Sequence, residues 1–431
     1  MVAERKRHSR SFGLGALQLH LAPTRILLPR RPRLRPPALA AVAFCALVFW
    51  TNAPRSQAAG AESPPLPAPT ATAHVQVQNW TVELPGGEAA FRQTLVATSF
   101  TLPALHPTLS LRGYVPVAWS TDEEADADLS GLGDARLRLT YRRPAASWSL
   151  TGGIDLPTGK TSLTTNEYQV AARMLASRVL DFGFKRPGEG FDIMLGAAAA
   201  RPVGRNTVLG LAAAGYLKGA YTVHEPEGGE RLRAEPGDRL HLSLSLLVRE
   251  HDQNPDWDLR TALGLQIAQA SWLDQGATRE QVREGVAGTL EAVYGRRLGI
   301  EDRLTLSLFL LARDRYRLEE GAYPVADILG ISTRWVGEVG ASYRHPVHGL
   351  ADLCVRVVHA GFRVDPGAGV NSRVTSLALS AERLIGGKTT LGLRATYGFG
   401  RTPWTSAEDP ARWVKRNLAG TTLGITLTRG F

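Results

Sequence analysis

Charged residues recur at every second position of several apolar segments, a spacing that could line a water-filled passage. Alternate residues of a β-strand face opposite sides, so such charges share one face while apolar residues occupy the other. Opposed arginines and acids across a lumen would set a transverse field and select among solutes, or would close the lumen as a salt-bridge network. The candidates are Arg112, Arg136, Arg138, Arg260, Arg356 and Arg394, with Asp155, Glu338, Asp352 and Glu382.

Motifs for other chemistry are weak. The segment from Gly153 to Thr161 resembles a phosphate-binding loop, but five residues separate its glycines where the motif has four. His345 and His348 lie three apart in an expected turn, which predicts solvated histidines rather than a metal site. The sequence has no nucleophile elbow, CxxC pair or HExxH motif. We therefore expect no enzyme, cofactor or metal; the remote alternative is a hydrolase with its active site at the rim of a β-barrel.

Strands are needed to position these charges, and the chain contains sixteen candidates. Leu137, Leu139 and Tyr141 alternate with Arg136 and Arg138, and the alternation resumes after a short turn. The first pair is the weakest, so fourteen is the alternative count. The predicted strands are 75–84, 91–102, 109–120, 133–143, 146–157, 191–203, 207–222, 239–251, 258–272, 287–300, 303–315, 332–346, 350–364, 373–386, 388–400 and 419–431.

The connections between these strands alternate in length, except that the first outer connection, 85–90, is also short. Short turns, most of them with Pro, Gly, Asn or Asp, are expected at 103–108, 144–145, 204–206, 252–257, 301–302, 347–349 and 387. Longer loops are expected at 121–132, 158–190, 223–238, 273–286, 316–331, 365–372 and 401–418. Short periplasmic turns, longer extracellular loops and an even strand count are typical of an all-β, transmembrane, antiparallel up-and-down β-barrel.

The N-terminal segment has the order of an export signal. Residues 1–58 carry ten basic side chains and one acid, which accounts for +9 of the formal +10 charge of the whole chain. Residues 38–50 are uncharged and apolar, and small residues follow at 56–61. We predict a signal peptide with a long basic n-region over 1–59, a Pro/Ala-rich flexible segment over 60–74, and a barrel over 75–431. The alternative for 38–50 is an anchor helix. The nearly neutral remainder argues against nucleic acid as a partner.

Two further segments suggest partners and a constriction. Phe431 ends the last predicted strand as a terminal aromatic, the type of signal read by the barrel-assembly machinery, although Arg429 interrupts its apolar face. Thr164 and Glu167 have the spacing of a capping box before a helical apolar pattern, which predicts either a lid or constriction helix or a surface helix packed on a neighbouring loop. The acidic stretches 122–128 and 225–230 are solvated loops, or bind divalent ions with lipopolysaccharide.

The segment Gly131–Arg142, its turn and the strand ending at Leu156–Lys160 resemble the phenol-degradation-pathway outer-membrane proteins, relatives of the long-chain fatty-acid transporters. Residues 188–204 are similar to the next strand of that family. The resemblance covers about 91–222, and the family's N-terminal plug is not evident. It implies an outer-membrane channel or uptake porter that passes small, hydrophobic or aromatic compounds by passive diffusion. The expected partners are outer-membrane lipid, lipopolysaccharide and a small-molecule solute. The alternative is a non-transporting structural or surface-binding barrel.

Overall fold

A computed structural model describes the chain from Pro69 to Phe431, except 85–86, 104–107, 144–146, 176, 178, 187, 251–254, 284, 300, 315–316, 319–332, 349, 365–370 and 406–412. The predicted signal peptide lies outside these residues. No helix in the described part of the chain is both long enough and apolar enough to cross a membrane.

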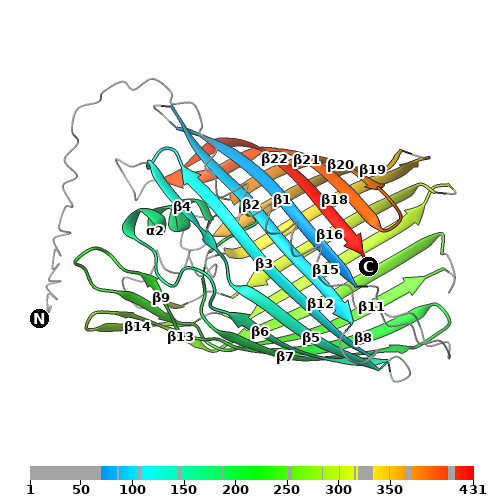
Figure 1. Cartoon of the computed structure of the whole chain (residues 1–431), viewed down its shortest axis with the longest axis horizontal. Helices are drawn as coiled ribbons and strands as arrows, with labels where there is room; N and C mark the ends of the chain where they lie inside the picture. Colours follow the sequence, from blue (N-terminus) through cyan, green and yellow to red (C-terminus); the bar gives the residue numbers. More distant parts are fainter. Residues whose placement is uncertain are drawn as a thin grey trace, which may run out of the picture. The chain divides into compact units, whose positions relative to one another are not determined.

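A closed antiparallel barrel of 16 strand positions forms the wall (Figure 1). Each strand pairs with the next, and β22 pairs back to β1 from Thr70↔Gly430 to Val82↔Leu418. The wall strands are β1 (Thr70–Leu84), β2 (Gly87–Pro103), β3 (Leu109–Asp122), β4 (Ala127–Leu132) continued by β5 (Ala135–Arg143), β6 (Trp148–Leu156), β7 (Asp192–Pro202), β8 (Thr207–Leu217), β11 (Arg239–Arg249), β12 (Trp257–Ala268), β15 (Ala287–Arg297), β16 (Arg303–Arg313), β18 (Thr333–Val347), β19 (Ala351–Val364), β20 (Asn371–Leu384), β21 (Thr389–Thr405) and β22 (Trp413–Gly430).

The predicted fold class, strand count and sorting of loops are confirmed. All sixteen predicted strands correspond to wall positions. The short connections gather at one end of the barrel and the long ones at the other, except that the short β1–β2 connection lies at the end with the long loops. We call these the short-turn end and the long-loop end. The first strand begins at Thr70, five residues before the predicted start at Val75. Period-two alternation fixes the pairing register of each strand, because a slip of one residue would exchange its apolar and polar faces.

Four of the predicted loops, 121–132, 223–238, 273–286 and 316–331, contain strands that the sequence did not suggest. Residues 127–132 form β4, which lies in line with β5 against β3. The predicted loops 223–238 and 273–286 contain hairpins of a second, five-stranded sheet at the long-loop end (Figure 1). Its strands are β9 (Tyr221–His224), β10 (Leu232–Glu235), β13 (Ala270–Gln275), β14 (Thr278–Arg283) and β17 (Arg317–Leu318). These strands are short and rich in charged residues, so their sequences show too little alternation of apolar and polar residues to predict them.

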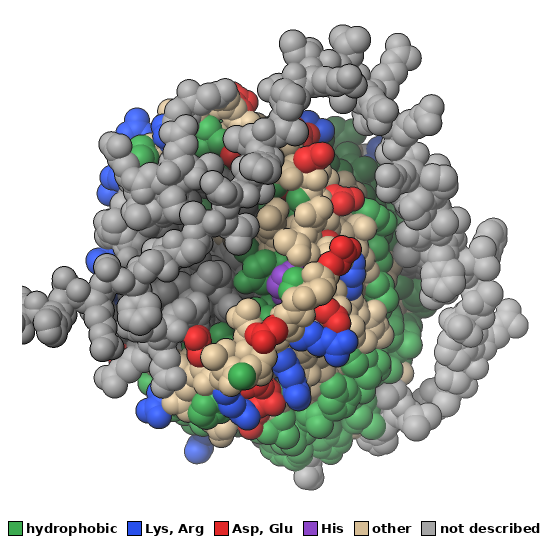
Figure 2. Space-filling view, turned by 90° about the vertical axis from the view of Figure 1, so that its left-hand side faces the viewer, with side chains coloured by type: hydrophobic (Ala, Val, Ile, Leu, Met, Phe, Trp, Pro, Cys, Tyr) green, Lys and Arg blue, Asp and Glu red, His purple; other side chains and the backbone are tan. Residues whose placement is uncertain are grey.

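The outer face of the wall is apolar. Leu195, Leu211, Val339 and Leu423 are each at least 60% exposed, and they share their face with most of the other exposed large hydrophobics. Seen from the long-loop end, hydrophobic side chains cover the visible wall while charged groups gather at the rim (Figure 2). A closed barrel satisfies the backbone hydrogen bonds of its strands internally, which allows such an apolar exterior to face lipid.

Candidate functional site: the lumen and the loop that enters it

The connection between β6 and β7 contains the helix predicted from the capping box. α2 (Thr165–Val170) continues into one π-helical turn, η2 (Ala171–Leu175). The Thr164 backbone N–H donates to Glu167 Oε2 at 3.0 Å, and the Glu167 N–H donates to Thr164 Oγ1 at 3.4 Å. Burial favours a higher pKa for the Glu167 carboxyl, but hydrogen bonds from Lys160 and Thr164, together with the positive charge of Lys160, outweigh burial and lower the pKa.

This loop, residues 157–191, fills part of the lumen with apolar side chains. Val170, Met174 and Leu175 are completely buried. They belong to one cluster with inward-facing residues of strands around the wall, namely Trp80, Val82, Ala89, Phe91, Leu129, Leu311, Val336, Ala360, Phe362, Val374 and Leu418. All of these wall residues lie toward the long-loop ends of their strands. We call the described residues between 165 and 184 the apolar plug. The sequence left a lid, a constriction or a surface helix open, and the packing places the helix inside the barrel.

Two glutamines attach the plug to the wall. Gln78 and Gln93 are directly opposite on β1 and β2, and both face inward. The Gln93 amide donates to Phe184 O at 2.8 Å and accepts from Phe184 N at 2.9 Å. Gln78 likewise donates to Asp181 O at 3.3 Å and accepts from Gly183 N at 3.0 Å. Each glutamine side chain therefore donates one hydrogen bond to the plug backbone and accepts one from it, as a neighbouring strand would.

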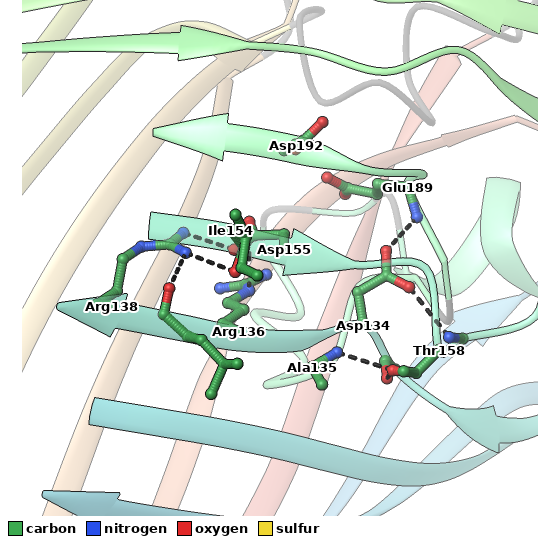
Figure 3. A network of polar contacts seen from close by, with 12 residues as sticks. Asp134, Ala135, Arg136, Arg138, Ile154, Asp155, Thr158, Glu189 and Asp192 are labelled. Atoms are coloured by element: carbon green, nitrogen blue, oxygen red, sulfur yellow. Dashed lines mark hydrogen bonds and ion pairs between the residues drawn. The ribbon is translucent and has the colours of Figure 1, made fainter. Parts of the chain in front are cut away.

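A third attachment closes the neck of the loop. Asp134, in the joint between β4 and β5, accepts from Gly159 N at 3.0 Å and from Glu189 N at 2.6 Å (Figure 3). These two residues lie near the start and the end of the loop. Leu163 and Tyr168 also bind the small sheet, through a bridge to His224 and a ring stack on its imidazole at 4.7 Å. The plug is thus tied by discrete polar contacts around an apolar centre.

Three predicted charges meet on the inner face of β5 and β6. Arg138 Nη2 lies 2.6 Å from Asp155 Oδ1, and Arg136 Nε lies 4.0 Å from Asp155 Oδ2 (Figure 3). Arg138 Nη1 also donates to the carbonyls of Leu137 and Ile154, both at 3.0 Å. Its side chain lies across Gly153, where a Cβ would come within 2.2 Å of Arg138 Cδ. One carboxylate is therefore shared by two cations, which leaves net positive charge.

A similar arrangement occurs nearer the short-turn end. Arg260 Nε lies 3.0 Å from Asp258 Oδ2, and Arg303 pairs with the other oxygen of the same carboxylate. Asp352 pairs with Arg344 on the neighbouring strand. Asp258, Arg303 and Arg344 were not predicted, although they have the inward parity of the residues that were.

Three predicted arginines have no acidic partner in the described part of the chain: Arg112, Arg356 and Arg394, all exposed on the inner face. Arg356 and Arg394 line a chamber of about 740 Å³ toward the short-turn end. Glu382 supplies an acid, and the remaining lining is mostly small or hydroxylated: Thr305, Ser307, Ser342, Ser380, Thr390, Thr426 and Thr428, with His74, Val293 and Cys354. The lumen therefore has an apolar outer part and a polar inner part in which cations outnumber acids.

The other predicted site residues lie apart from this chamber. Glu338 faces inward on β18 between the buried Val336 and Gly340. Phe431 follows β22, where the Arg429 guanidinium lies 5.6 Å from the centre of its ring. His345 and His348 pair with the acids Asp302 and Glu301 of the neighbouring turn, at 2.6 and 3.4 Å. Within the described residues, no group of three or more His, Cys, Asp or Glu side chains could hold a metal.

The fold and site define a closed β-barrel whose lumen contains an inward-folded loop above a cationic chamber. The chain matches no family model and no curated protein. Among solved structures it is similar to the outer membrane protein opdK from Pseudomonas aeruginosa (11% identity, TM-score 0.40, 84% of this chain and 99% of that one). It is also similar to P. aeruginosa OccK2 in complex with glucuronate (14%, 0.41, 84% and 98%) and to the P. putida toluene transporter TodX (10%, 0.39, 84% and 90%).

Proposed function

We propose that this protein is an outer-membrane channel for the passive uptake of small organic solutes that combine an apolar part with a negative charge. The observation that carries the proposal is the order of environments along the lumen: the apolar plug at the long-loop end, followed by the chamber of Arg356 and Arg394. An apolar exterior and a polar interior are the pattern of barrels that conduct across the outer membrane. The long-loop end is then extracellular, and the short-turn end is periplasmic.

The unpaired arginines support the anionic part of the proposal. Charged rings and patches inside a pore select permeant ions by their field. Arg112, Arg356 and Arg394 form no ion pair within the described residues, Glu382 is the one acid beside two of them in the chamber, and Asp155 and Asp258 are each shared by two arginines. The apolar part of the solute would contact the cluster around the plug and the smaller neighbouring cluster of Leu95, Ala97, Ala118 and Phe184, against which Tyr114 packs.

Planar-bilayer recording of the refolded protein tests this function. We expect discrete conductance steps and, in a KCl gradient, a reversal potential of the sign for chloride over potassium. The double variant Arg356→Gln/Arg394→Gln should shift that potential toward cation selectivity. Arg383→Gln is the matched control, because Arg383 is exposed on the outer face near the short-turn end. A folded barrel without conductance, even after the plug attachments are removed, would overturn the channel.

The alternative is a barrel that does not transport and binds partners through its loops. The fully buried plug residues and the polar attachments favour this alternative, because a plug that stays in place would close the lumen. Loss of all conductance in plug-released variants would select this alternative.

A further inference from the structure

A cluster of cations lies on the outer face of the wall, away from the lumen. Arg373 on β20, Arg401 on β21 and Lys415 on β22 are all exposed. Val374 and Thr402, which follow Arg373 and Arg401 directly, and Leu418, three residues after Lys415, all have the opposite strand parity, face inward and are buried. The three cations therefore project outward from adjacent strands. We call them the outer-wall basic cluster.

The position of this cluster along the wall is distinctive. Toward the short-turn end, the same strands present Leu377, Leu379, Tyr397 and Phe399 outward, each 44–54% exposed. Toward the long-loop end, the strands lead into the connections 365–370 and 406–412. The cluster thus lies at the boundary between the apolar band and the long loops. Charged groups of membrane lipids lie at the corresponding depth in a bilayer.

The electrostatics of the lipid-free cluster are unfavourable. Arg373 and Arg401 are direct cross-strand partners on one face, and like charges in that relation destabilise a sheet. None of the three cations has an acidic partner among the residues that the structure describes. Arg401 Nε donates to Asn417 Oδ1 at 3.2 Å, and Asn417 Nδ2 in turn donates to Glu83 Oε2 at 2.8 Å. One carboxylate, reached through an amide, does not neutralise three cations.

The side chains of the cluster surround a hollow rather than a flat patch. A cavity of about 530 Å³ is lined by Arg373, Arg401 and Lys415, with Thr375, Phe399 and Asn417. Guanidinium groups bind phosphate oxygens in pairs of parallel hydrogen bonds, and a lysine adds a point charge. The Phe399 ring at the edge of the cavity continues into the apolar band, so an acyl chain could extend below a bound phosphate.

The geometry points to a binding site for a phosphorylated lipid of the leaflet at the long-loop end, with its phosphate in the outer-wall basic cluster and its acyl chains over Leu377, Leu379 and Phe399. In an outer membrane this lipid is the phosphorylated glycolipid part of lipopolysaccharide. The inference rests on the proposed membrane placement but not on conduction. The acidic loops are weaker candidates, because Glu123 and Glu225 already pair with Arg92 and Arg231 at 3.0 and 2.6 Å.

Lipid binding to the refolded full chain in detergent tests the site. Native mass spectrometry would compare bisphosphorylated lipid A, its dephosphorylated form and inorganic phosphate. We expect the bisphosphorylated lipid to bind at least tenfold more tightly than the dephosphorylated form, and Arg373→Gln/Arg401→Gln to remove most of that difference. Arg383→Gln is the control, because Arg383 is exposed on the same face of the same strand beyond the apolar band. Heat-modifiable gel migration shows that each variant is folded.

Equal binding of the two lipids, or unchanged binding by the double variant, would overturn the site. Inorganic phosphate binding as tightly as the lipid would also overturn it and would indicate a site for a free anion. Conductance in bilayers without lipopolysaccharide is measured separately. A conducting barrel without lipid selectivity would therefore contradict only this inference, and a lipid-binding barrel without conductance only the channel.

Discussion

Removing one plug attachment should open the lumen. In Gln93→Ala, the plug loses both hydrogen bonds to Phe184, and the backbone N–H and C=O of that residue are left without their partner. Gln93 is 1% exposed and Phe184 6%, so water replaces these bonds poorly. A net hydrogen bond contributes about 1 kcal/mol, and each buried unsatisfied group adds a penalty of about 1–3 kcal/mol.

Together these terms destabilise the docked plug by roughly 2–4 kcal/mol, after allowance for partial rehydration. Since about 1.4 kcal/mol corresponds to a factor of ten, the undocked population should rise roughly 30- to 700-fold. Single-channel recording would register this as more frequent or longer openings. Gln266→Ala is the matched control, because Gln266 faces the lumen on β12 and has no hydrogen bond to the plug in the described structure.

A second readout uses Cys354, which lines the chamber. In a Cys45→Ser background it is the only thiol of the chain. A charged methanethiosulfonate added on the long-loop side should reduce the current of Gln93→Ala faster than that of the parent. Unchanged opening and unchanged modification in Gln93→Ala and in Gln78→Ala/Gln93→Ala would refute the view that these glutamines hold the plug.

Three other perturbations follow from the same contacts. Acidification should release the plug helix: the pKa of Glu167 lies below its usual 4.5, so its stabilising contribution is complete above that value and is lost as pH falls through the lower pKa of the folded state. Openings should then increase in acid below about pH 4.5, and Glu167→Gln should remove this dependence at an already raised baseline. Asp155→Asn should strengthen anion selectivity in a KCl gradient, because it frees two arginines; a shift toward cations would contradict the assignment. Arg401→Gln should stabilise the lipid-free barrel in detergent by about 0.2–1 kcal/mol by relieving repulsion from Arg373, and a lower midpoint in denaturant would contradict that repulsion.

Local pattern was enough to predict the wall. In each strand, apolar residues for the lipid face alternate with polar or small residues for the lumen face. In β11, for example, Leu240, Leu242 and Leu244 alternate with His241 and Ser243. The lengths of the connections then predicted which strand ends lie at the short-turn end of the barrel and which at the long-loop end. The same parity predicted the inward position of Arg356 and Arg394, which line one chamber. The capping box of Thr164 and Glu167 predicted a helix because both of its partners lie within one turn.

Contacts between distant segments were decided only by the tertiary structure. The Gln93 side chain hydrogen-bonds to Phe184, and the Asp134 carboxylate hydrogen-bonds to the Glu189 backbone. In both pairs the partners are far apart in the sequence, and no nearby sequence pattern predicts either contact. Barrel curvature selects which acids meet which arginines, so the sharing of Asp155 and Asp258 could not be predicted from strand parity. Alternation in the sequence therefore determined the face on which each side chain lies. Closure of the sheet, which brings β22 against β1 and folds the loop 157–191 inward, determined what that side chain contacts.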